Sequence, residues 1–489
     1  MTPAIASQAI DQKLKKGRAF PGAFGSFAAP VLVFCLGVLG NSLAHAQRSP
    51  EGLPAHLAPQ AASKAESLPV PSAPARDLYA KYRDRLVQVR LLLKSASEQS
   101  IAGSGFVVQA DDGKGALLVT NYHVVSALAI DPAKYRIELR QTNDAVAEAE
   151  LIAIDVAHDL AVLRTRPAAK TDASSSTWRA KVAFDLRDTL PAQGERLYSL
   201  GHPMGVAFLI SEGIFNGLKE QQLYDHMVFS GALNPGMSGG PAIDANGRVA
   251  GVNVSGLRNA QLLNFLVPVS HARALIAKAK DSAPRNEWRT EIAQQLLAHQ
   301  EVFTAKLFGA KDTAVRPQGF GSQQLAGRAV QTLDDSLTRC NASANTGDGV
   351  RYRRESLACQ MKSGVYVHGT MQTGAVVVGH NLYTNVSLAT PQFLNMRGGR
   401  PYVAWMDQRG GGEKTREECH DAFLRGAQRE YRVSMCTNAY RKFPGLYDIT
   451  VRAVQTDDAR QHLESRLHVS GVSWDNGQKI AKAFVERLQ

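Results

Sequence analysis

The sequence predicts an all-β double barrel, followed by a C-terminal domain of α+β type. Short apolar runs alternate with turn residues across the first half of the chain, and no long helical pattern separates them. Such a succession favours antiparallel barrels over a parallel sheet covered by helices. Beyond residue 336, further strand-like runs end in a helical segment, which predicts a mixed second domain.

The predicted strands are short and closely spaced in both parts of the chain. In the barrel region they cover residues 87–93, 105–110, 116–120, 136–139, 150–155, 160–164, 196–200, 228–230, 241–244, 249–254 and 265–268. In the C-terminal region they cover residues 365–370, 375–378, 402–406, 432–435, 447–454 and 467–472. Residues 310–329 read as a loop.

Helical periodicity is limited to four places. A short helix is predicted over residues 77–86, and a second one over residues 270–280 with Ser270 as its N-cap. A stripe of apolar residues from Trp288 to Leu307 predicts an amphipathic helix, which either covers the barrel or belongs to a separate module. A terminal helix is predicted after Asp475 as N-cap.

With 489 residues the chain has room for two or three domains. The residue patterns predict five segments, each with a distinct composition. They are an export signal at 1–46, a flexible linker at 47–76, the double barrel at 77–282, a helix and linker at 283–335, and the C-terminal domain at 336–489.

The first 46 residues have the pattern of an export signal. Four basic residues precede the apolar run Ala29 to Leu39, and Ala44-His45-Ala46 forms a small-x-small cleavage site. An uncleaved anchor is the alternative, although the run is shorter than the ~20 residues that a membrane span needs. We therefore expect a periplasmic or secreted protein with no integral membrane segment after signal removal.

Cysteine usage fits an oxidising compartment. Of five cysteines, one lies in the signal and the other four are confined to the C-terminal third, at Cys340, Cys359, Cys419 and Cys436. An even set predicts two disulfides, and pairing between sequence neighbours is the simplest arrangement. A zinc site is the alternative, but the tight C-x2-C spacing of such sites is missing. No metal and no cofactor is predicted.

The formal net charge is +12, and the first 46 residues carry a net +3 of it, so the remainder keeps +9. A basic surface can attract anionic partners. The basic residues are dispersed, however, and no aromatic-basic motif of a nucleic-acid reader is present. We therefore expect a solvated basic surface and no nucleic-acid partner.

Three separate segments carry a serine nucleophile and its two supporting residues. A serine between glycines, Ser238, follows an Asn-Pro turn, while His123 and Asp159 lie upstream, each next to strand-like apolar residues. Nucleophilic catalysis by serine needs a base to accept its proton and an acid to orient that base. The chain order His, Asp, Ser is that of the chymotrypsin type. Each residue alone is commonly structural, and it is the joint pattern that predicts a triad.

The glycine before the predicted nucleophile has a role of its own. Gly236 permits a turn that points the amides of Gly236 and Ser238 at a developing oxyanion. Met237 offers a further amide in the same turn, so the predicted oxyanion hole comprises Gly236, Met237 and Ser238. His202, in a Gly-His-Pro-Met-Gly segment, is interpreted as a loop residue near the cleft rather than as a catalyst.

At these motifs the sequence resembles the protease domain of the HtrA/Deg family of chymotrypsin-fold serine peptidases. The resemblance covers residues 78–282 and is carried by segments 103–106, 120–125, 159–163, 200–205 and 234–240. It implies two perpendicular six-stranded barrels with His123, Asp159 and Ser238 in the cleft between them. It also implies cleavage of unfolded or damaged envelope proteins.

The sequence departs from that family in three respects. No segment after the barrels resembles a PDZ domain, so regulation and oligomeric state are left open. Met237 replaces the polar residue usual before the serine, so the activation switch of trypsin-like zymogens, which depends on an aspartate there, looks absent. The barrel region also has no cysteine and must rely on packing.

Residues for substrate specificity follow from spacing in this fold. Ala232 lies where the floor of the primary pocket is expected, and no acidic residue accompanies it. Val254, Ser255 and Gly256 belong to the strand along which a substrate would pair by strand addition. This pattern predicts cleavage after a small or medium apolar residue rather than after lysine or arginine.

The sequence thus predicts an exported serine endopeptidase that acts on polypeptides through an acyl-enzyme intermediate. Two alternatives stay open. The first is a catalytically silent binding protein that keeps a protease-like barrel while its C-terminal domain recognises a partner. The second is a serine esterase, since the same nucleophile can attack esters.

Overall fold

A computed structural model describes the chain from Ser72 to Leu488, apart from residues 97, 167–177, 179, 181, 204–207, 221, 257–261, 309–318, 346, 363, 399–411 and 426–428. From Pro71 onward the chain forms one compact unit. The predicted export signal, most of the predicted flexible linker and the predicted strand at 402–406 lie outside the described residues. No helix within the described ranges is both long enough and apolar enough to cross a membrane.

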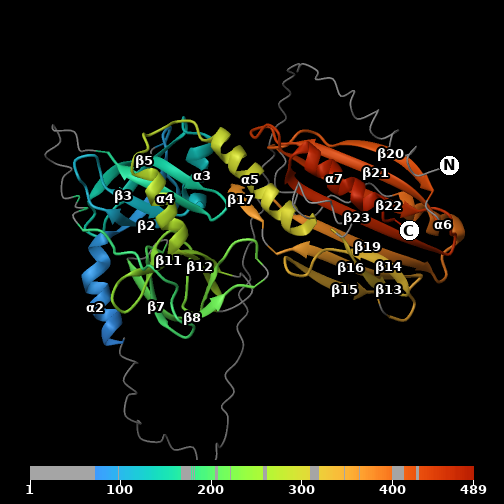
Figure 1. The fold of residues 1–489 in the computed structure, drawn as a ribbon, viewed down its shortest axis with the longest axis horizontal. Coiled ribbons are helices and arrows are strands. Elements are labelled where there is room, and N and C mark those ends of the chain that lie inside the picture. The colour runs from blue at the N-terminus through green and yellow to red at the C-terminus, as the bar shows by residue number, and fades with distance from the viewer. Residues whose placement is uncertain are drawn as a thin grey trace, which may run out of the picture. The chain divides into compact units, whose positions relative to one another are not determined.

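The first barrel closes through six antiparallel strands in the order β1-β2-β3-β6-β5-β4 (Figure 1). Its inward side chains are mainly valine, leucine and isoleucine, which suit a pleated, half-buried surface. The strands are β1 (Leu86–Leu93), β2 (Glu98–Gln109), β3 (Leu117–Thr120), β4 (Tyr135–Arg140), β5 (Val146–Asp155) and β6 (Leu160–Thr165).

The second barrel closes in the order β10-β11-β12-β9-β8-β7. This arrangement confirms the predicted pair of barrels. The strands are β7 (Arg196–Gly201), β8 (Leu209–Leu218), β9 (Met227–Phe229), β10 (Pro241–Ile243), β11 (Val249–Gly256) and β12 (Asn264–Pro268). Strand β8 is missing from the sequence prediction because only two of its ten residues are buried and two are glycines, which leaves no apolar alternation.

Helix α3 (Tyr122–Ile130) corrects the prediction that His123 lies among strand residues. Its valines at 124 and 125 and its alanine at 129 are all buried, so the helix is surrounded by protein. A short apolar run of this kind has no visible helical period, and it cannot be distinguished from a buried strand by its pattern. His123 therefore lies in the first turn of a buried helix.

Three further helix boundaries differ from those predicted. Helix α2 (Ala73–Tyr82) begins four residues before the predicted start, because the Ser72 hydroxyl accepts a hydrogen bond from the Ala75 amide. A short 3-10 turn, η1 (Arg83–Arg85), follows it. Residues 73–76 are thus helical rather than part of a flexible linker. Helix α4 (Val269–Ala279) is preceded by Pro268, not by a Ser270 cap. Helix α7 (Trp474–Val485) is capped by Ser473, two residues before the predicted cap Asp475.

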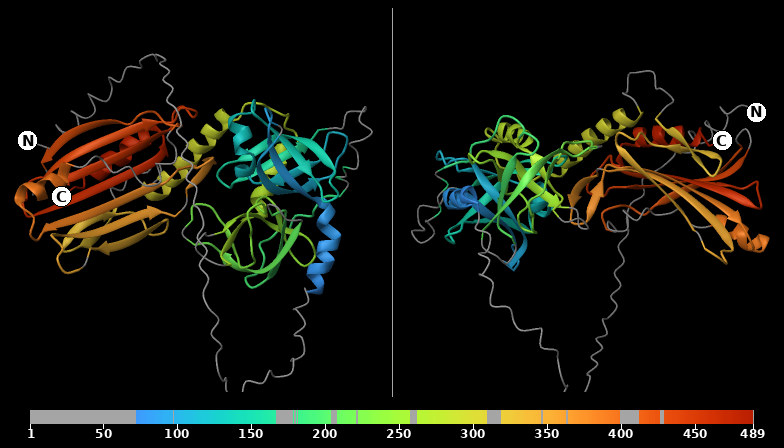
Figure 2. Two further views of the ribbon diagram at one scale, coloured as in Figure 1. Left: turned by 180° about the vertical axis from the view of Figure 1, so that it is seen from behind. Right: turned by 90° about the horizontal axis from the view of Figure 1, so that it is seen from below.

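Helix α5 (Arg289–Phe308) joins two hydrophobic cores. Residues of its first half, Ile292 and Leu296, pack with the core of the first barrel. Phe303 and Leu307 of its second half pack with the core of the C-terminal domain. Both views in Figure 2 show this helix running from the first barrel to the C-terminal sheet. Both predicted alternatives therefore hold in part, since the helix covers the barrel and also supports the second domain.

A seven-stranded antiparallel sheet in the order β15-β16-β19-β23-β22-β21-β20 dominates the C-terminal domain. The domain is therefore β-rich, which corrects the predicted α+β type. Its short helices α6 (Thr390–Asn395), η2 (Met396–Gly398) and α7 are additions to this one sheet. The strands are β15 (Thr338–Ala344), β16 (Tyr352–Met361), β19 (Val376–Asn385), β20 (Glu418–Arg425), β21 (Glu430–Ala439), β22 (Tyr447–Gln455) and β23 (Gln461–Val472).

Two hairpins lie outside this sheet. The first pairs β13 (Gly321–Leu325) with β14 (Arg328–Thr332), so the end of the predicted loop at 310–329 is a hairpin, while residues 310–318 of that prediction lie outside the described residues. Strand β13 is almost wholly exposed and carries no apolar alternation. The second hairpin pairs β17 (Val365–His368) with β18 (Met371–Thr373). Helix α7 lies along the sheet, where Ile480 and Phe484 pack against the core (Figure 1).

The two disulfides join Cys340 to Cys359 and Cys419 to Cys436, the pairing between sequence neighbours that we expected. Each one links an edge strand of the seven-stranded sheet to the strand inside it, since the cysteines are direct partners in the β15–β16 and β20–β21 registers. Both edge strands are largely exposed. An edge strand has only one hydrogen-bonded neighbour, so the disulfide helps to hold each exposed edge strand in the sheet.

Removal of one link tests this account. We expect the double change Cys340→Ser with Cys359→Ser to lower the free energy of unfolding of the C-terminal domain by about 3 kcal/mol, because the unfolded chain regains the freedom of a closed loop. The thermal unfolding midpoint of the full chain and the amide exchange of β15 measure this change. Unchanged exchange in β15 would contradict the stapling role.

Candidate active site

Asp159 sits in the turn between β5 and β6 with a φ of 56°, a left-handed conformation that is uncommon for a residue other than glycine. Hydrogen bonds hold it there. Its carbonyl accepts from the Asn121 side-chain amide at 2.8 Å and from the Tyr122 backbone amide at 3.1 Å. Both donors lie at the start of α3, so the turn is fixed against the helix that carries His123. Strained backbone held this firmly is typical of functional sites.

The Asp159 carboxylate holds His123 through two contacts. One oxygen accepts the His123 backbone amide at 2.8 Å, and the other lies 2.6 Å from the Nδ1 atom of the imidazole. The first contact satisfies an amide of the first helical turn, which has no partner within the helix. The second requires the proton of the neutral ring to be on Nδ1. The Nε2 atom is thereby left as the basic nitrogen.

The electrostatics of this pair favour the imidazolium. Burial disfavours a charged ring, but the attraction of Asp159 and its hydrogen bond more than offset it, so the pKa of His123 is raised above its ordinary value. The ring is not sealed off, since 30% of the His123 side chain remains exposed. The arrangement suits a base that accepts a proton during a reaction.

The segment from Asn234 to Met237 forms a tight turn before Ser238. The Met237 amide donates to the Asn234 carbonyl at 3.0 Å, and Gly236 has a φ of 98°. Proline and glycine thus occupy the two central positions that a type II turn prefers. Because the Met237 amide closes this turn, it is not available to an oxyanion, and the predicted hole is reduced to the amides of Gly236 and Ser238.

Three consecutive carbonyl groups of this segment are held by buried donors. The Gly236 carbonyl accepts from the Ser104 hydroxyl at 2.7 Å, and the Ser238 carbonyl accepts from the Ser104 amide at 2.7 Å. The Met237 carbonyl accepts from the Asn253 side-chain amide at 3.3 Å. Ser104 and Asn253 are fully buried. The carbonyls therefore point into the protein, and the turn is fixed from both barrels.

Gly239 explains why the segment continues with glycine. With a φ of 85°, its backbone passes so close to β2 that a Cβ atom would lie 2.3 Å from the Ser104 carbonyl oxygen. The same Cβ atom would lie 2.4 Å from the Thr120 hydroxyl. Any larger residue would push the nucleophile turn away from the first barrel.

The Ser238 hydroxyl has a backbone partner in this structure. It donates to the Val254 carbonyl at 3.2 Å rather than to His123. The register of β11 against β12 shifts between Asn253 and Ser255, so Val254 lies in a bulge of the strand. A bulge frees backbone groups from the ladder, which lets the Val254 carbonyl accept this bond.

The predicted specificity residues are located as follows. Ala232 is exposed, just after Gly231, whose carbonyl accepts from the buried Asn264 side chain at 2.7 Å. Val254 is half-buried, and Ser255 and Gly256 continue β11. These positions lie in the segments before and after the nucleophile turn.

His202 is buried and its amide donates to the Ser104 hydroxyl at 2.8 Å. Burial lowers the pKa of its imidazole to about 4, so this ring stays neutral near pH 7. His202 supports Ser104 through this backbone hydrogen bond and not through its imidazole. We therefore keep the interpretation that His202 is not the base.

Sequence reasoning missed several residues of the site. Ser104 lies in the segment 103–106 that carries the family resemblance, and Asn253 is a polar residue inside an apolar strand. A polar residue in such a place is expected to be buried and hydrogen-bonded, so both positions could have been predicted. Tyr366 gave no such signal. Its ring centroid lies 6.0 Å from that of His123, although it comes from hairpin β17–β18 of the C-terminal domain.

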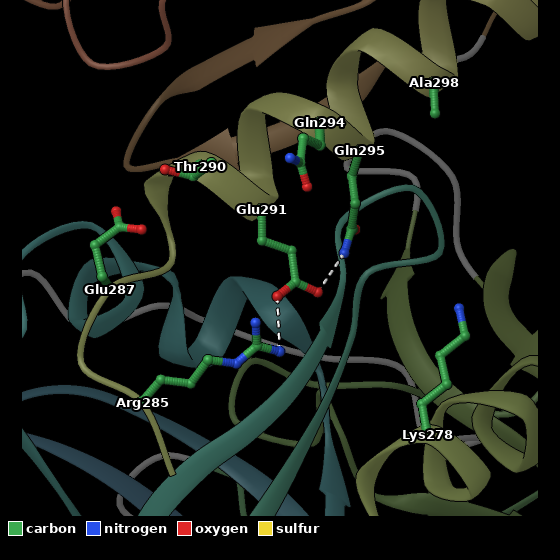
Figure 3. Close-up of a pocket in the computed structure, with 8 residues that line it drawn as sticks. All are labelled: Lys278, Arg285, Glu287, Thr290, Glu291, Gln294, Gln295 and Ala298. Atoms are coloured by element: carbon green, nitrogen blue, oxygen red, sulfur yellow. Dashed lines mark hydrogen bonds and ion pairs between the residues drawn. The ribbon is translucent and has the colours of Figure 1, made fainter. Parts of the chain in front are cut away.

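One hollow in the described part of the molecule lies away from these residues. It measures about 490 Å³ and is lined from the start of α5, with none of His123, Asp159 or Ser238 among its residues (Figure 3). Its polar groups already pair with one another, as Glu291 contacts Arg285 at 2.9 Å and Gln295 at 3.1 Å. This hollow is therefore not the predicted cleft.

Metal ligation has one geometric candidate among the described residues, the group of Glu417, Cys419 and Cys436. Its two sulfur atoms are joined to each other in a disulfide. A disulfide sulfur is not a thiolate, which is the form that binds metals. The group is therefore no ligand set.

Comparison with known proteins agrees with this geometry. Residues 103–252 match the family described as trypsin-like peptidase domain. The serine protease HTRA1A of Danio rerio is 28% identical over 238 residues, which make up 44% of this chain and 43% of the relative. A probable periplasmic serine endoprotease, DegP-like, of Chlamydia trachomatis is 30% identical over 185 residues, or 36% of this chain and 33% of the relative.

Among solved structures, the serine endoprotease from Yersinia pestis is 20% identical and covers 43% of this chain and 67% of its own, with a TM-score of 0.34. This chain spans less than half the length of the curated relatives that it matches. The family match at residues 103–252 runs from β2 to β11 and includes His123, Asp159 and Ser238. Residues 103–252 are therefore similar to trypsin-like peptidase domains, and the relatives of this chain include HTRA1A and DegP-like serine proteases.

Proposed function

We propose that the protein is a serine endopeptidase in which Ser238 is the nucleophile, His123 the general base and Asp159 the residue that orients the base. The observation that carries this proposal is the two-point hold of Asp159 on His123, at 2.8 Å and 2.6 Å. A carboxylate that fixes both the backbone and the ring leaves Nε2 as the only basic position. That is the requirement for a histidine that activates serine.

The reaction begins with a rotation of the Ser238 side chain from the Val254 carbonyl towards His123. The Ser238 oxygen then attacks the carbonyl carbon of the scissile bond while its proton passes to Nε2 of His123. The amides of Gly236 and Ser238 stabilise the oxyanion. The imidazolium next gives its proton to the leaving amine, the carbon–nitrogen bond breaks, and an acyl-enzyme forms. Water repeats the sequence and releases the acid.

Polypeptide is the substrate class that this site favours. The segment from Val254 to Gly256 ends β11 beside the nucleophile, where an extended peptide can pair through main-chain hydrogen bonds. The named relatives include serine proteases. Esters remain chemically accessible to the same nucleophile, and turnover of casein against a small ester separates the two classes.

The proposed location is the periplasm or the exterior of the cell. The basic and apolar pattern of residues 1–46 supports export, and the two disulfides of the C-terminal domain suit an oxidising compartment. One relative is itself described as periplasmic. A role in quality control of envelope proteins is the extension of this proposal that the resemblance to the HtrA/Deg family suggests.

The nucleophile can be tested directly. A fluorophosphonate probe should label the full chain at Ser238, and Ser238→Ala should abolish labelling and lower kcat by about 10⁶-fold. Ser270→Ala, at an exposed serine of α4, is the matched control and should label normally. A wild-type chain without a Ser238 adduct would favour the binding-protein alternative. The hydrogen bond from the Ser238 hydroxyl to the Val254 carbonyl would then explain why this serine does not react.

The role of the base predicts a pH dependence. His123 must be neutral to accept a proton, and its pKa is raised, so kcat/KM should fall on acidification from a pH above the ordinary histidine value. Asp159→Asn should lower kcat by about 10⁴-fold. In Asp159→Asn the acid limb of the residual activity should shift to lower pH, because without the carboxylate only burial acts on the imidazole and lowers the pKa of His123. A wild-type profile that stays flat down to pH ~4 would contradict this role.

Specificity gives a further test. We expect a peptide library to be cleaved after small or medium apolar residues, since Ala232 offers neither charge nor length. Ala232→Asp should raise the rate of cleavage after lysine and arginine by about 10-fold or more, because a carboxylate at this position pairs with a cationic side chain. Mass spectrometry of the digest reads both results. A wild-type digest dominated by lysine and arginine sites would overturn the assignment of Ala232.

A further inference from the structure

Hairpin β17–β18 of the C-terminal domain is built into the core of the first barrel. Val365, Val367 and Met371 are buried and belong to the same hydrophobic cluster as Val125 of α3. Along β17 buried and half-buried residues alternate, and the half-buried Tyr366 packs against the edge of the same cluster. The hairpin therefore has a fixed orientation towards α3.

A buried hydrogen bond fixes its position along the helix. The hydroxyl of Tyr122, the residue before His123, donates to the Val367 carbonyl at 2.8 Å. Both groups are inside the protein, and the loss of either partner would leave a buried polar group unpaired. The hairpin therefore cannot slide along α3 without breaking this bond.

Tyr366 lies beside the imidazole as a result. Its ring and that of His123 meet edge to face, with centroids 6.0 Å apart and planes at 80°. Its hydroxyl lies 3.3 Å from the Ser126 hydroxyl, which in turn donates to the His123 carbonyl at 3.1 Å. Tyr366 thus contacts His123 directly at the ring and indirectly at the backbone.

The charge near Tyr366 keeps it a neutral phenol. Burial raises the pKa of its hydroxyl, and the nearby Asp159 carboxylate raises it further, although the hydrogen bond to Ser126 acts in the opposite direction. A neutral ring can pack against the imidazole in both of its protonation states. It supplies contact rather than charge.

We propose that Tyr366 is a positioning residue for His123, so that the C-terminal domain completes the active site of the peptidase domain. Asp159 fixes the ring at Nδ1 only, and a single hydrogen bond leaves rotation about that contact. The Tyr366 ring removes this freedom by packing against the side of the imidazole. The inference deepens the proposed function and rests on it for the catalytic role of His123.

The test compares three variants of the full chain. Tyr366→Ala removes the ring, and Tyr366→Phe keeps the ring but removes the hydroxyl. Tyr352→Ala is the matched control, because Tyr352 is a half-buried tyrosine of β16 whose ring also lies 6.0 Å from another, that of Tyr383. Thermal unfolding midpoints show whether each variant is folded.

Kinetics provide the first readout. We expect Tyr366→Ala to lower kcat and the rate of fluorophosphonate labelling by about 10-fold with little change in KM, because the base is less well oriented rather than the substrate less well bound. Tyr366→Phe should stay within about 2-fold of wild type, and Tyr352→Ala should be unchanged. Wild-type kcat in Tyr366→Ala, or an equal loss in Tyr352→Ala, would overturn the proposal.

The second readout does not depend on activity. With histidine labelled by ¹⁵N, the Nδ1 proton of His123 should give a downfield NMR signal in the wild type and in Tyr366→Phe. In Tyr366→Ala that signal should broaden or disappear, since the ring is free to leave Asp159. A signal unchanged in Tyr366→Ala would overturn the positioning role. Absence of labelling at Ser238 with this pattern intact would instead count against the proposed peptidase activity.

Discussion

Three consecutive carbonyl groups, of Gly236, Met237 and Ser238, each accept a hydrogen bond from a buried donor, and the geometry of the site depends on those bonds. Ser104 supplies two of them from the first barrel and Asn253 supplies the third from the second barrel. A buried carbonyl without a partner costs about 1–3 kcal/mol, so the turn has one strongly favoured orientation. The segment that carries Ser238 is therefore held by both barrels at once, and the relative position of the barrels sets where Ser238 lies.

The second constraint is the pairing of α3 with the turn at Asp159. A left-handed residue other than glycine is unfavourable by about 1–3 kcal/mol. Here four hydrogen bonds to the carbonyl and carboxylate of Asp159 offset that cost. All four donors belong to Asn121, Tyr122 and His123. Because the strain and its compensation occupy the same few residues, a change at Asp159 should alter the helix start as well as the imidazole.

These constraints show which features can be predicted from sequence. The glycine-flanked serine and the chain order of His123, Asp159 and Ser238 are local patterns with a chemical meaning, and they are readable. Helix α3 is not, because a short and largely buried helix has the same apolar pattern as a buried strand. The edge strands β15 and β20 cannot be predicted either, because they are largely exposed on both faces and therefore carry no apolar alternation. Tyr366 depends on a contact between residues 240 positions apart, and no local pattern encodes such a contact.

Helix α5 gives the physical reason why that distant contact is possible. Trp288, Ile292 and Leu296 belong to the barrel core, while Phe303 and Leu307 belong to the core of the sheet. A continuous helix of 20 residues transmits position along its length, because its rise per residue is fixed. The two cores are thus set at a defined distance, and hairpin β17–β18 reaches α3 from a sheet that α5 has already placed. The C-terminal domain is in this sense structurally tied to the predicted active site, because a shift of α5 against the first barrel would move Tyr366 away from His123.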